Sequence, residues 1–269
     1  MKVMGILNVT PDSFSDGGKY DRIDKAVAHA RQMVADGASI VDVGGESTRP
    51  GARKISSQEE LERVIPVIRA LKRVLDVPIS IDTYKAEVAR FAVEAGASIV
   101  NDVGGAKLDP QMAKVMAQTG AEVILMHHGT HEKEGAMQNL QQELVADLRA
   151  SIDLVVSAGV DPKKITVDPG IGFGKTMVQN TEILKNIDVY RQLLGFPLLL
   201  GASKKRLVRH LMVGDQDQDA DAQMLGIGTI ATTCYAYGKG VDIVRVHDVK
   251  ANVCAINVMK NLGVDPYDL

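Results

Sequence analysis

Residues 37–82 read GASIVDVGGESTRPGARKISSQEELERVIPVIRALKRVLDVPISID, and the spacing of the apolar residues changes twice along this segment. Residues 39–43 form an almost continuous apolar run, which is typical of a strand buried on both faces. Residues 61–75 carry apolar side chains at positions 61, 64, 65, 68, 71 and 75, the spacing of one helix face. Residues 78–81 return to a short apolar run. The segment therefore predicts a strand, a helix and a second strand, the repeating unit of a parallel sheet.

The same unit recurs along the whole chain of 269 residues. Mostly β-branched runs predict strands at residues 3–7, 39–43, 78–81, 98–100, 122–125, 165–167, 197–200 and 242–246, each followed by a helical stretch. Four glycines stand just before strands, where a helix end favours positive φ: Gly37, Gly96, Gly120 and Gly159. Strict alternation of eight units predicts an α/β, single-domain (β/α)8 TIM barrel over residues 1–269, with an open doubly wound sheet as the alternative.

Composition places the chain among soluble, folded proteins. It has 31 Lys and Arg, 34 Asp and Glu, a formal net charge of −3 and 45% hydrophobic residues, which excludes intrinsic disorder. No apolar run approaches the about 18 residues that span a bilayer, and no signal-like start is present, so we expect a cytoplasmic protein without membrane contacts. A pI near 6.1 without a basic tract argues against nucleic acid as a partner. Cys234 and Cys254 lack metal-site spacing and are expected to be reduced core thiols.

Polar residues gather where the predicted strands end. In a barrel, the loops that follow the strands converge on one face, where the chemistry takes place. The residues at these positions are Asn8, Asp42, Glu46, Arg49, Asp82, Asn101, Asp102, His127, His128, Asp168, Ser203, Lys205, Arg206, Arg245 and His247. Helix capping accounts for some of the Asn, Asp and Ser residues, but not for Lys205, Arg245 or His247. This face is therefore predicted to carry a site.

One corner of the face is suited to an anion. Arg245 and His247 alternate on the last strand, so both side chains leave it on the same side. An arginine offers a planar fork of donors that fits phosphate, although a salt bridge with Asp242 or Asp248 is the alternative. Asn8 ends the first strand, which neighbours the last strand in a closed barrel, and its amide oxygen suits Mg²⁺ beside a phosphate. A diphosphate with Mg²⁺ is predicted here.

The centre of the face is suited to a planar heterocycle. Asp82, Asn101, Asp168 and Lys205 end four different strands and together offer two carboxylates, an amide and an ammonium. A ring N–H beside an amino group would donate two parallel hydrogen bonds to one carboxylate. Met126, with its polarizable sulfur, can cover an aromatic face. Asp82 and Asp168 could each be helix or turn caps, but the four groups together favour a guanine-like or pterin-like ligand.

Two loops on the same face, residues 10–18 and 44–53, are longer than the common connection of about two to six residues. Long loops beside a site often act as lids, and Asp16 and Arg49 are candidates to meet across the closed site.

Two other patterns are not predicted to be sites. His127 and His128 are adjacent, so their side chains point in opposite directions and a shared metal is awkward. The glycine-rich residues 170–175 match neither the P-loop nor the dinucleotide motif, and are predicted to be only a loop.

These motifs, taken together, resemble the dihydropteroate synthase family. The match covers residues 4–18, 43–51, 80–83, 101–103, 125–127, 168–173, 203–205 and 245–249, one motif for each strand. The resemblance implies condensation of 6-hydroxymethyl-7,8-dihydropterin diphosphate with 4-aminobenzoate, which releases diphosphate and forms dihydropteroate for folate synthesis. It also implies an SN1-like displacement, a sulfonamide target, and a homodimer formed through the late helices. Residues 224–237, apolar or small around most of a helix, agree with burial on two sides.

The resemblance also implies roles for individual residues. Asn8 matches a Mg²⁺ ligand, and Arg245 with His247 matches the diphosphate-binding pair. The pterin pocket is matched by Asp82, Asn101, Met126, Asp168 and Lys205. The aminobenzoate side is matched by Phe14, Thr48, Pro50, Phe173 and Ser203. Asp16 and Arg49 would close the two long loops and exclude water.

The sequence departs from the family pattern at two places. Lys204 replaces the usual arginine after the seventh strand and so loses the planar fork, and residues 128–131 lack a proline often found there. A pterin-dependent methyltransferase domain shares the barrel, but would not need the long loops or the diphosphate corner. A non-catalytic pterin-binding relative would be expected to lack Asn8, Arg49 or Arg245, and all three are present.

Overall fold

The computed structural model describes residues 1–10, 19–47, 51–129, 140–214 and 221–266. Its centre is a parallel sheet in the strand order β6-β5-β4-β3-β2-β1-β8-β7. The strands are β1 Lys2–Asn8, β2 Ile40–Gly44, β3 Ile79–Asp82, β4 Ile99–Asp102, β5 Glu122–Met126, β6 Ile165–Asp168, β7 Leu199–Leu200 and β8 Ile243–Val246. A bridge between Val167 and Leu198 joins the two ends of this order, so the sheet closes into a barrel. The TIM barrel prediction is confirmed, and the open doubly wound alternative is wrong.

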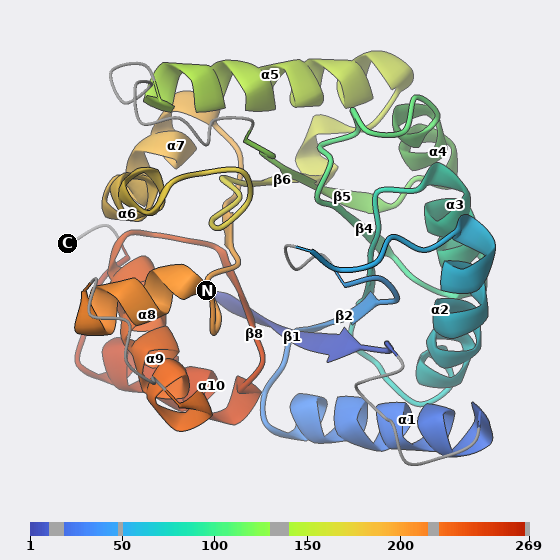
Figure 1. The fold of residues 1–269 in the computed structure, drawn as a ribbon, viewed down its shortest axis with the longest axis horizontal. Helices are drawn as coiled ribbons and strands as arrows, with labels where there is room; N and C mark the ends of the chain where they lie inside the picture. Colours follow the sequence, from blue (N-terminus) through green and yellow to red (C-terminus); the bar gives the residue numbers. More distant parts are fainter. Residues whose placement is uncertain (11–18, 48–50, 130–139, 215–220, 267–269) are drawn as a thin grey trace.

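Helices surround the barrel on all sides (Figure 1). They are α1 Lys19–Ala35, α2 Ser57–Lys72, α3 Ala86–Ala95, α4 Met112–Thr119, α5 Leu140–Ala158, α6 Met177–Lys185, α7 Ile187–Leu194, α8 Arg206–Val213, α9 Ala222–Gly238 and α10 Val249–Asn261, with a short 3-10 helix at Pro162–Lys164. The prediction of one helix after each strand is wrong in two places. Asn186 ends α6 and begins α7, while Gly214, at φ +66°, ends α8 and the side chain of Asp221 caps α9.

Six strands continue beyond the apolar runs that predicted them. The strand pairing includes Asp82 opposite Asn101 and Met126 opposite Asp168, so these side chains start from the rigid ladder and not from loops. The four glycines before the strands have φ values of +102°, +124°, +65° and +110°, as predicted from their position.

The inside of the barrel changes from apolar to polar along its length. One layer of the interior is a separate apolar cluster that consists of Met4, Ile40, Ile99, Ile124, Leu199 and Ile243. Side chains alternate along a strand, so the residue two positions further on points to the same side. Two positions after three of these residues stand the polar residues Asp42, Asn101 and Arg245, and Met126 follows Ile124 in the same way. Asp82 pairs with Asn101 in the same ladder and completes the polar group. The apolar layer therefore forms the floor beneath a polar layer at the carboxyl ends of the strands.

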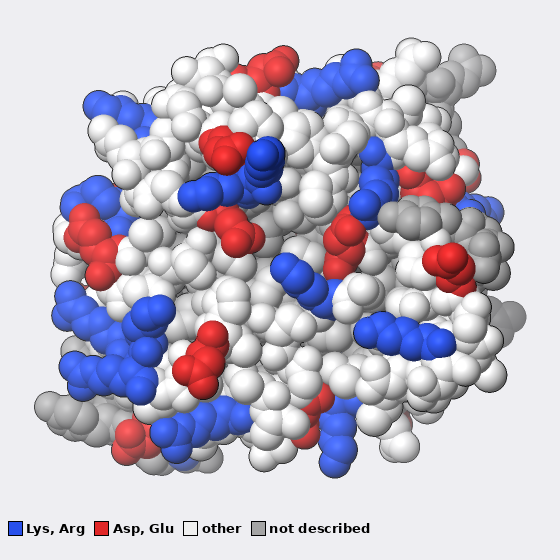
Figure 2. All heavy atoms as spheres, turned by 180° about the vertical axis from the view of Figure 1, so that it is seen from behind, with Lys and Arg blue, Asp and Glu red and all other residues white. Residues whose placement is uncertain are grey.

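The outer surface is mixed in character. Figure 2 shows Lys and Arg side chains interspersed with Asp and Glu on the face opposite to the view of Figure 1. Cys234 and Cys254 are free, but Cys254 is exposed on α10, so the prediction of a core thiol is wrong there because its side chain faces solvent. On α9, Met224 and Ile227 are 39% and 58% exposed in the single chain. Within the described part of the chain, no helix is both long and apolar enough to span a membrane.

Candidate active site

The guanidinium of Arg245 lies between two carboxylates inside the mouth of the barrel. Its Nε donates to Oδ2 of Asp42 and its Nη2 to Oδ2 of Asp82, both at 2.6 Å. Asp42 is completely buried and also accepts a hydrogen bond from Nδ2 of Asn101 at 3.3 Å. These four residues come from β2, β3, β4 and β8, so the pairing ties together strands from different parts of the chain.

The alternative partners proposed for Arg245 are wrong. Nζ of Lys204 lies 2.9 Å from Oδ2 of Asp248, while Asp242 pairs with Arg191. Both aspartates are near Arg245 in the sequence, but side chains point alternately along an extended strand, and Arg245 points into the barrel. The cap interpretation of Asp82 is also wrong: its Oδ2 accepts from Arg245, and the first N–H groups of α3 donate instead to Thr83 and Asp109.

Burial and charge act against each other in this group. Burial alone lowers the pKa of Arg245, but Asp42 and Asp82 outweigh burial and hold that pKa above its usual value. Burial raises the pKa of Asp82 to about 7, although the charge of Arg245 opposes the rise. Oδ1 of Asp82 and Oδ1 of Asp42 are buried without a hydrogen-bond partner among the described residues. Buried acceptors of this kind are costly unless a ligand or water completes them.

The opposite side of the mouth is formed by the ends of β6 and β7. Oδ1 of the buried Asp168 accepts from the backbone N–H of Gly170 at 2.7 Å, so the cap interpretation of this residue is confirmed. Nζ of Lys205 donates to the carbonyl of Ile171 at 2.6 Å and lies 4.5 Å from the ring centroid of Phe173. Burial raises the pKa of Asp168, and burial lowers the pKa of Lys205 to about 8 while Asp168 opposes the fall.

The predicted anion corner is partly assembled. Oγ of Ser203 lies 3.0 Å from Nδ1 of His247 and accepts from the backbone N–H of His247 at 3.2 Å. β1 pairs with β8 as predicted, which brings Asn8 to the same end of the barrel. A Cβ at Gly44 would lie 3.4 Å from Oδ1 of Asn8 and 3.8 Å from Oδ2 of Asp82. The absent side chain of Gly44 leaves space between two oxygen atoms, and hard oxygen donors are the ligands that Mg²⁺ prefers.

The described residues would supply Mg²⁺ with few direct ligands. No group of three or more His, Cys, Asp or Glu within the described ranges could enclose a metal ion. Magnesium commonly keeps several waters and binds one or two protein oxygens beside substrate phosphates. The donor set at Asn8 therefore fits a metal that arrives with a diphosphate.

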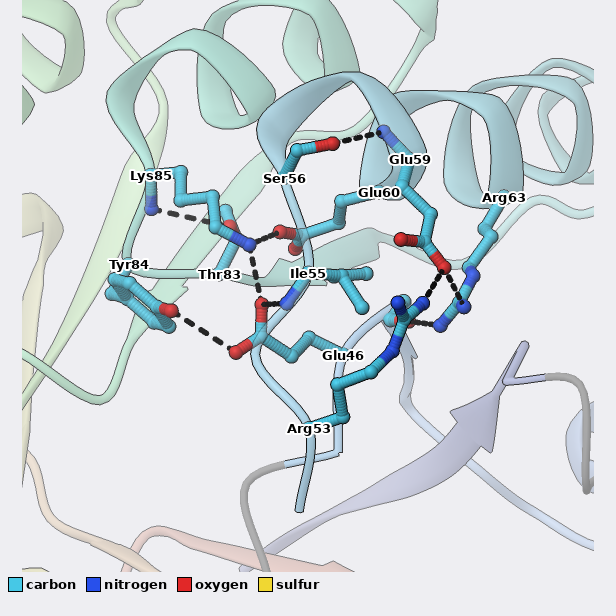
Figure 3. Close-up of polar contacts among 11 residues, drawn as sticks. Glu46, Arg53, Ile55, Ser56, Glu59, Glu60, Arg63, Thr83, Tyr84 and Lys85 are labelled. Atoms are coloured by element: carbon cyan, nitrogen blue, oxygen red, sulfur yellow. Dashed lines mark hydrogen bonds and ion pairs between the residues drawn. The ribbon is translucent and has the colours of Figure 1, made fainter.

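The segment after β2 is anchored by a buried ion cluster (Figure 3). Oε1 of Glu46 accepts from the hydroxyl of Tyr84 at 3.0 Å, and Oε2 bonds to Nζ of Lys85. Lys85 also bonds to Oε2 of Glu60 on α2 at 2.5 Å. The backbone N–H of Ile55 lies 3.5 Å from Oε2 of Glu46, so both flanks of the long loop are attached to this cluster.

Some predicted site residues lie outside the described residues: Phe14, Asp16, Thr48, Arg49 and Pro50. Met126, buried at the end of β5, and Asn101 are on the inner wall as predicted. Asp42 was placed on this face by its position at the end of a predicted strand but was given no role, and the structure shows it paired with Arg245. Its place two positions after the inward-facing Ile40 indicates that it points into the barrel. Lys175 was missed. Among the described residues, Lys175 donates to three backbone oxygens, which no side-chain pattern encodes.

Comparison with known proteins identifies the family of the chain. The family model described as "Pterin binding enzyme" matches residues 4–247. The dihydropteroate synthase of Bacillus subtilis is 51% identical over 248 residues, which cover 92% of this chain and 84% of that protein.

Solved structures agree in fold. The dihydropteroate synthase of Clostridium difficile, crystallised in the presence of pteroic acid, has a TM-score of 0.89 and 45% identity, covering 98% of this chain and 97% of its own. The enzyme of Xanthomonas albilineans with 4-aminobenzoic acid has a TM-score of 0.89 and 38% identity, covering 98% and 94%. The family match spans well over half of the chain, and the chain belongs to the family of pterin binding enzymes.

Proposed function

We propose that this protein is a dihydropteroate synthase. It condenses 6-hydroxymethyl-7,8-dihydropterin diphosphate with 4-aminobenzoate to give 7,8-dihydropteroate and diphosphate. The observation that carries the proposal is the polar layer of Arg245, Asp42, Asp82 and Asn101 above the apolar floor of the barrel. This layer holds two buried carboxylate oxygens without a hydrogen-bond partner among the described residues, at the face where barrel enzymes bind their substrates.

The pterin ring would lie on the inner wall between Asp82 and Asp168. Each carboxylate has one oxygen engaged by a protein donor, with Arg245 on Asp82 and the Gly170 N–H on Asp168. The remaining oxygens can accept the ring N–H and amino hydrogens of the pterin. Lys205 supplies a donor to a ring oxygen or nitrogen, and Met126 would cover the ring face.

The diphosphate would lie toward Arg245, His247 and Asn8. Arg245, like other arginines, is charged at every physiological pH, and Asp42 and Asp82 raise its pKa further, so it can stabilise the negative charge that develops on the leaving group. His247, positioned by Ser203, adds a further donor. Mg²⁺, when held at Asn8, would neutralise part of the diphosphate charge.

The displacement is proposed to be SN1-like. The bond between the pterin methylene carbon and the diphosphate oxygen breaks, and the electron pair leaves with the diphosphate. The carboxylates of Asp82 and Asp168 favour the positive charge that spreads over the pterin. The amine nitrogen of aminobenzoate then forms the new C–N bond and loses a proton to solvent. By resemblance, Phe173 and Ser203 face the aminobenzoate.

Five further residues complete the proposal by resemblance alone. Phe14, Thr48 and Pro50 are proposed to contact aminobenzoate, and Asp16 with Arg49 to exclude water from the cation. We also propose a cytoplasmic homodimer. Apolar side chains on the last two helices support the dimer, because Ile227 and Val258 are 58% and 56% exposed in the single chain.

Diphosphate release tests the proposed function. Purified protein is mixed with the pterin diphosphate, aminobenzoate and Mg²⁺, and separate reactions omit one component each. We expect diphosphate and dihydropteroate to appear in equal amounts, and only in the complete mixture. Pterin binding without release would identify a non-catalytic binding protein, and the absence of pterin binding would overturn the proposal.

A further inference from the structure

The side chain of Lys175 extends from the loop after β6 to the end of β5. Its Nζ donates to the carbonyl oxygens of Gly170 at 2.8 Å, Phe173 at 3.1 Å and His127 at 3.2 Å. A lysine ammonium has three N–H donors, so these three backbone oxygens match its full capacity. The contacts join two successive loops at the mouth of the barrel.

The two loops touch backbone to backbone. A Cβ at Gly170 would lie 1.9 Å from the carbonyl oxygen of His127, and a Cβ at Gly174 would lie 1.8 Å from that of Gly129. Both glycines have positive φ, at +71° and +57°. The N–H of Gly129 also donates to the carbonyl of Phe173 at 3.2 Å. Residues 170–174 are therefore seated directly on residues 127–129 in a conformation that depends on glycine.

The same loop holds two groups of the proposed ligand site. The carbonyl of Ile171 accepts the 2.6 Å hydrogen bond from Nζ of Lys205, and the ring of Phe173 lies beneath that ammonium. A Cβ at Gly172 would lie 3.2 Å from Cδ of Lys205, so the loop also packs against the aliphatic stem. A shift of this loop would move both Lys205 and Phe173.

We propose that Lys175 is a positioning residue for pterin binding: its ammonium fixes the loop of residues 170–174, and this loop fixes Lys205 and Phe173. The inference rests on the proposed function, because it assigns Lys205 and Phe173 to the ligands. Without the ammonium, three carbonyl oxygens would each lose a hydrogen bond, and those of Phe173 and Gly170 would keep the backbone N–H groups of Gly129 and Phe173. The tie between the Lys175 side chain and residue 127 would be lost, and we expect the loop to shift as its oxygens recover the lost donors. Burial lowers the pKa of Lys175 to about 7, with Asp168 opposing the fall, so retaining this lysine costs free energy that an apolar residue would not.

The principal test is Lys175→Met, which keeps the length of the side chain and removes its donors. We expect the dissociation constant of the pterin diphosphate to rise about tenfold or more, the equivalent of one lost hydrogen bond to a charged group. Lys164→Met is the matched control. Lys164 also donates to a backbone oxygen, that of Gly120 at 2.5 Å, but it lies at the opposite end of the barrel. This control should leave pterin affinity within about twofold of wild type.

A double-mutant cycle with Lys205→Met separates positioning from a general loss of structure. If Lys175 acts through Lys205, Lys175→Met should weaken binding by less than about threefold in the Lys205→Met background. The same factor in both backgrounds would overturn the proposal, and so would unchanged affinity in a folded Lys175→Met protein. Wild type is measured first, because a failure of wild type to bind pterin would overturn the proposed function instead.

Two further measurements apply if Lys175→Met does not fold. Lys175→Gln retains two N–H donors. We expect it to weaken pterin binding relative to wild type, but by less than the change of about tenfold expected for Lys175→Met. In wild type, pterin should slow hydrogen–deuterium exchange in peptides that cover residues 170–175. Exchange that is unchanged there, while peptides around Asp82 and Asn101 become protected, would contradict the proposed link between the loop and the ligand.

Discussion

Lys85 and Lys175 are both half-buried lysines that follow a strand of the barrel, yet their surroundings differ. Lys85 bonds to the carboxylates of Glu46 and Glu60, whereas Lys175 bonds to three backbone oxygens (Figure 3 shows the first). Burial alone lowers the pKa of each. The two carboxylates reverse this effect and raise the pKa of Lys85, while the pKa of Lys175 remains low, at about 7.

The same contrast separates the two cations closest to the proposed pterin. Arg245 has two carboxylates and a raised pKa, while Lys205 has a carbonyl oxygen and a pKa lowered to about 8. Cations near β2, β3 and β8 are therefore charged at every physiological pH. Those near β6 and β7 titrate close to neutrality, and their charge depends on the groups that a ligand brings. In the half of the mouth around Arg245 the charge of the cation is fixed, although Asp82 beside it has a pKa of about 7. In the half around Lys205 and Lys175 the charge of the cations responds to the bound ligand. We call these the fixed half and the responsive half.

The largest expected effect is a loss of stability when Arg245, in the fixed half, is replaced. Arg245→Met leaves Asp42 and Asp82 buried without their cation, and breaking such a pair costs about 3–5 kcal/mol. Urea unfolding at pH 7.5 measures the loss. Arg90→Met is the control, since Arg90 forms an exposed pair with Glu94 on α3 and should cost less than about 1 kcal/mol. If the free energy of unfolding fell equally in the two variants, the buried carboxylates would not depend on Arg245.

A direct comparison of the two lysines should give the next largest effect. Lys85→Met leaves two buried carboxylates and should lower the free energy of unfolding by about 3 kcal/mol. Lys175→Met loses hydrogen bonds to neutral oxygens but also removes a buried charge, so we expect about 1 kcal/mol. Both are measured by urea unfolding at pH 7.5. The difference in stability between wild type and Lys85→Met should decrease as pH falls. Burial already raises the pKa of Glu60, so this carboxyl takes up a proton readily, and a neutral carboxyl no longer needs the cation of Lys85. A larger fall in the free energy of unfolding for Lys175→Met than for Lys85→Met would contradict this difference between the two lysines.

Asp168→Asn tests the responsive half through its ligand. This carboxylate opposes the fall in the pKa of both Lys175 and Lys205, and it is proposed to accept hydrogens from the pterin. We expect pterin affinity to fall by about 1.5–3 kcal/mol, the range for hydrogen bonds to a charged group. Calorimetry measures the change, with circular dichroism as the control for folding. Unchanged affinity in a folded variant would exclude Asp168 from the pocket.

The smallest effect concerns pH and stability. Lys205 has a pKa of about 8 in the folded protein and the ordinary, higher value in the unfolded chain. Between these two values the unfolded chain binds more protons, so the contribution of Lys205 to stability increases as pH rises above about 8. The stability of wild type relative to Lys205→Met should therefore rise between pH 7 and pH 10, with a slope of at most about 1.4 kcal/mol per pH unit. Parallel pH curves for the two proteins would show that the lysine does not titrate in this range.

Sequence patterns predicted most of the barrel and placed several of the polar residues that line its mouth. Apolar runs located all eight strands because strands of a parallel barrel are buried on both faces. The partners of Arg245 were wrong because proximity in the sequence favoured Asp242 and Asp248, whereas inward-facing positions on β2 and β3 decide the pairing. Asp42 was placed on the predicted face by the same strand-end position as Asp82, but its pairing with Arg245 depends on the way the strands bring β2 and β8 together.

Backbone contacts explain what the sequence did not reveal. Residues 170–175 match no phosphate-binding motif and were predicted to be only a loop, and the structure shows a loop there. Their importance comes from three carbonyl oxygens and two close glycine contacts, which depend on where another loop lies. Likewise, the breaks at Asn186 and Gly214 that produce extra helices depend on local backbone angles rather than on apolar spacing.

The pairing of Arg245 also bears on the order in which the chain folds. Its contacts with Asp42 and Asp82 join residues that are 203 and 163 positions apart, so nearly the whole chain must be synthesised before they can form. Contacts of such high sequence separation form late and slow the folding of a domain. Until β8 docks beside β1, the two aspartates have no cation between them and oppose close packing of β2 against β3. We infer that closure of the barrel and completion of the pocket are one event, so a partly folded chain carries no half-formed binding site.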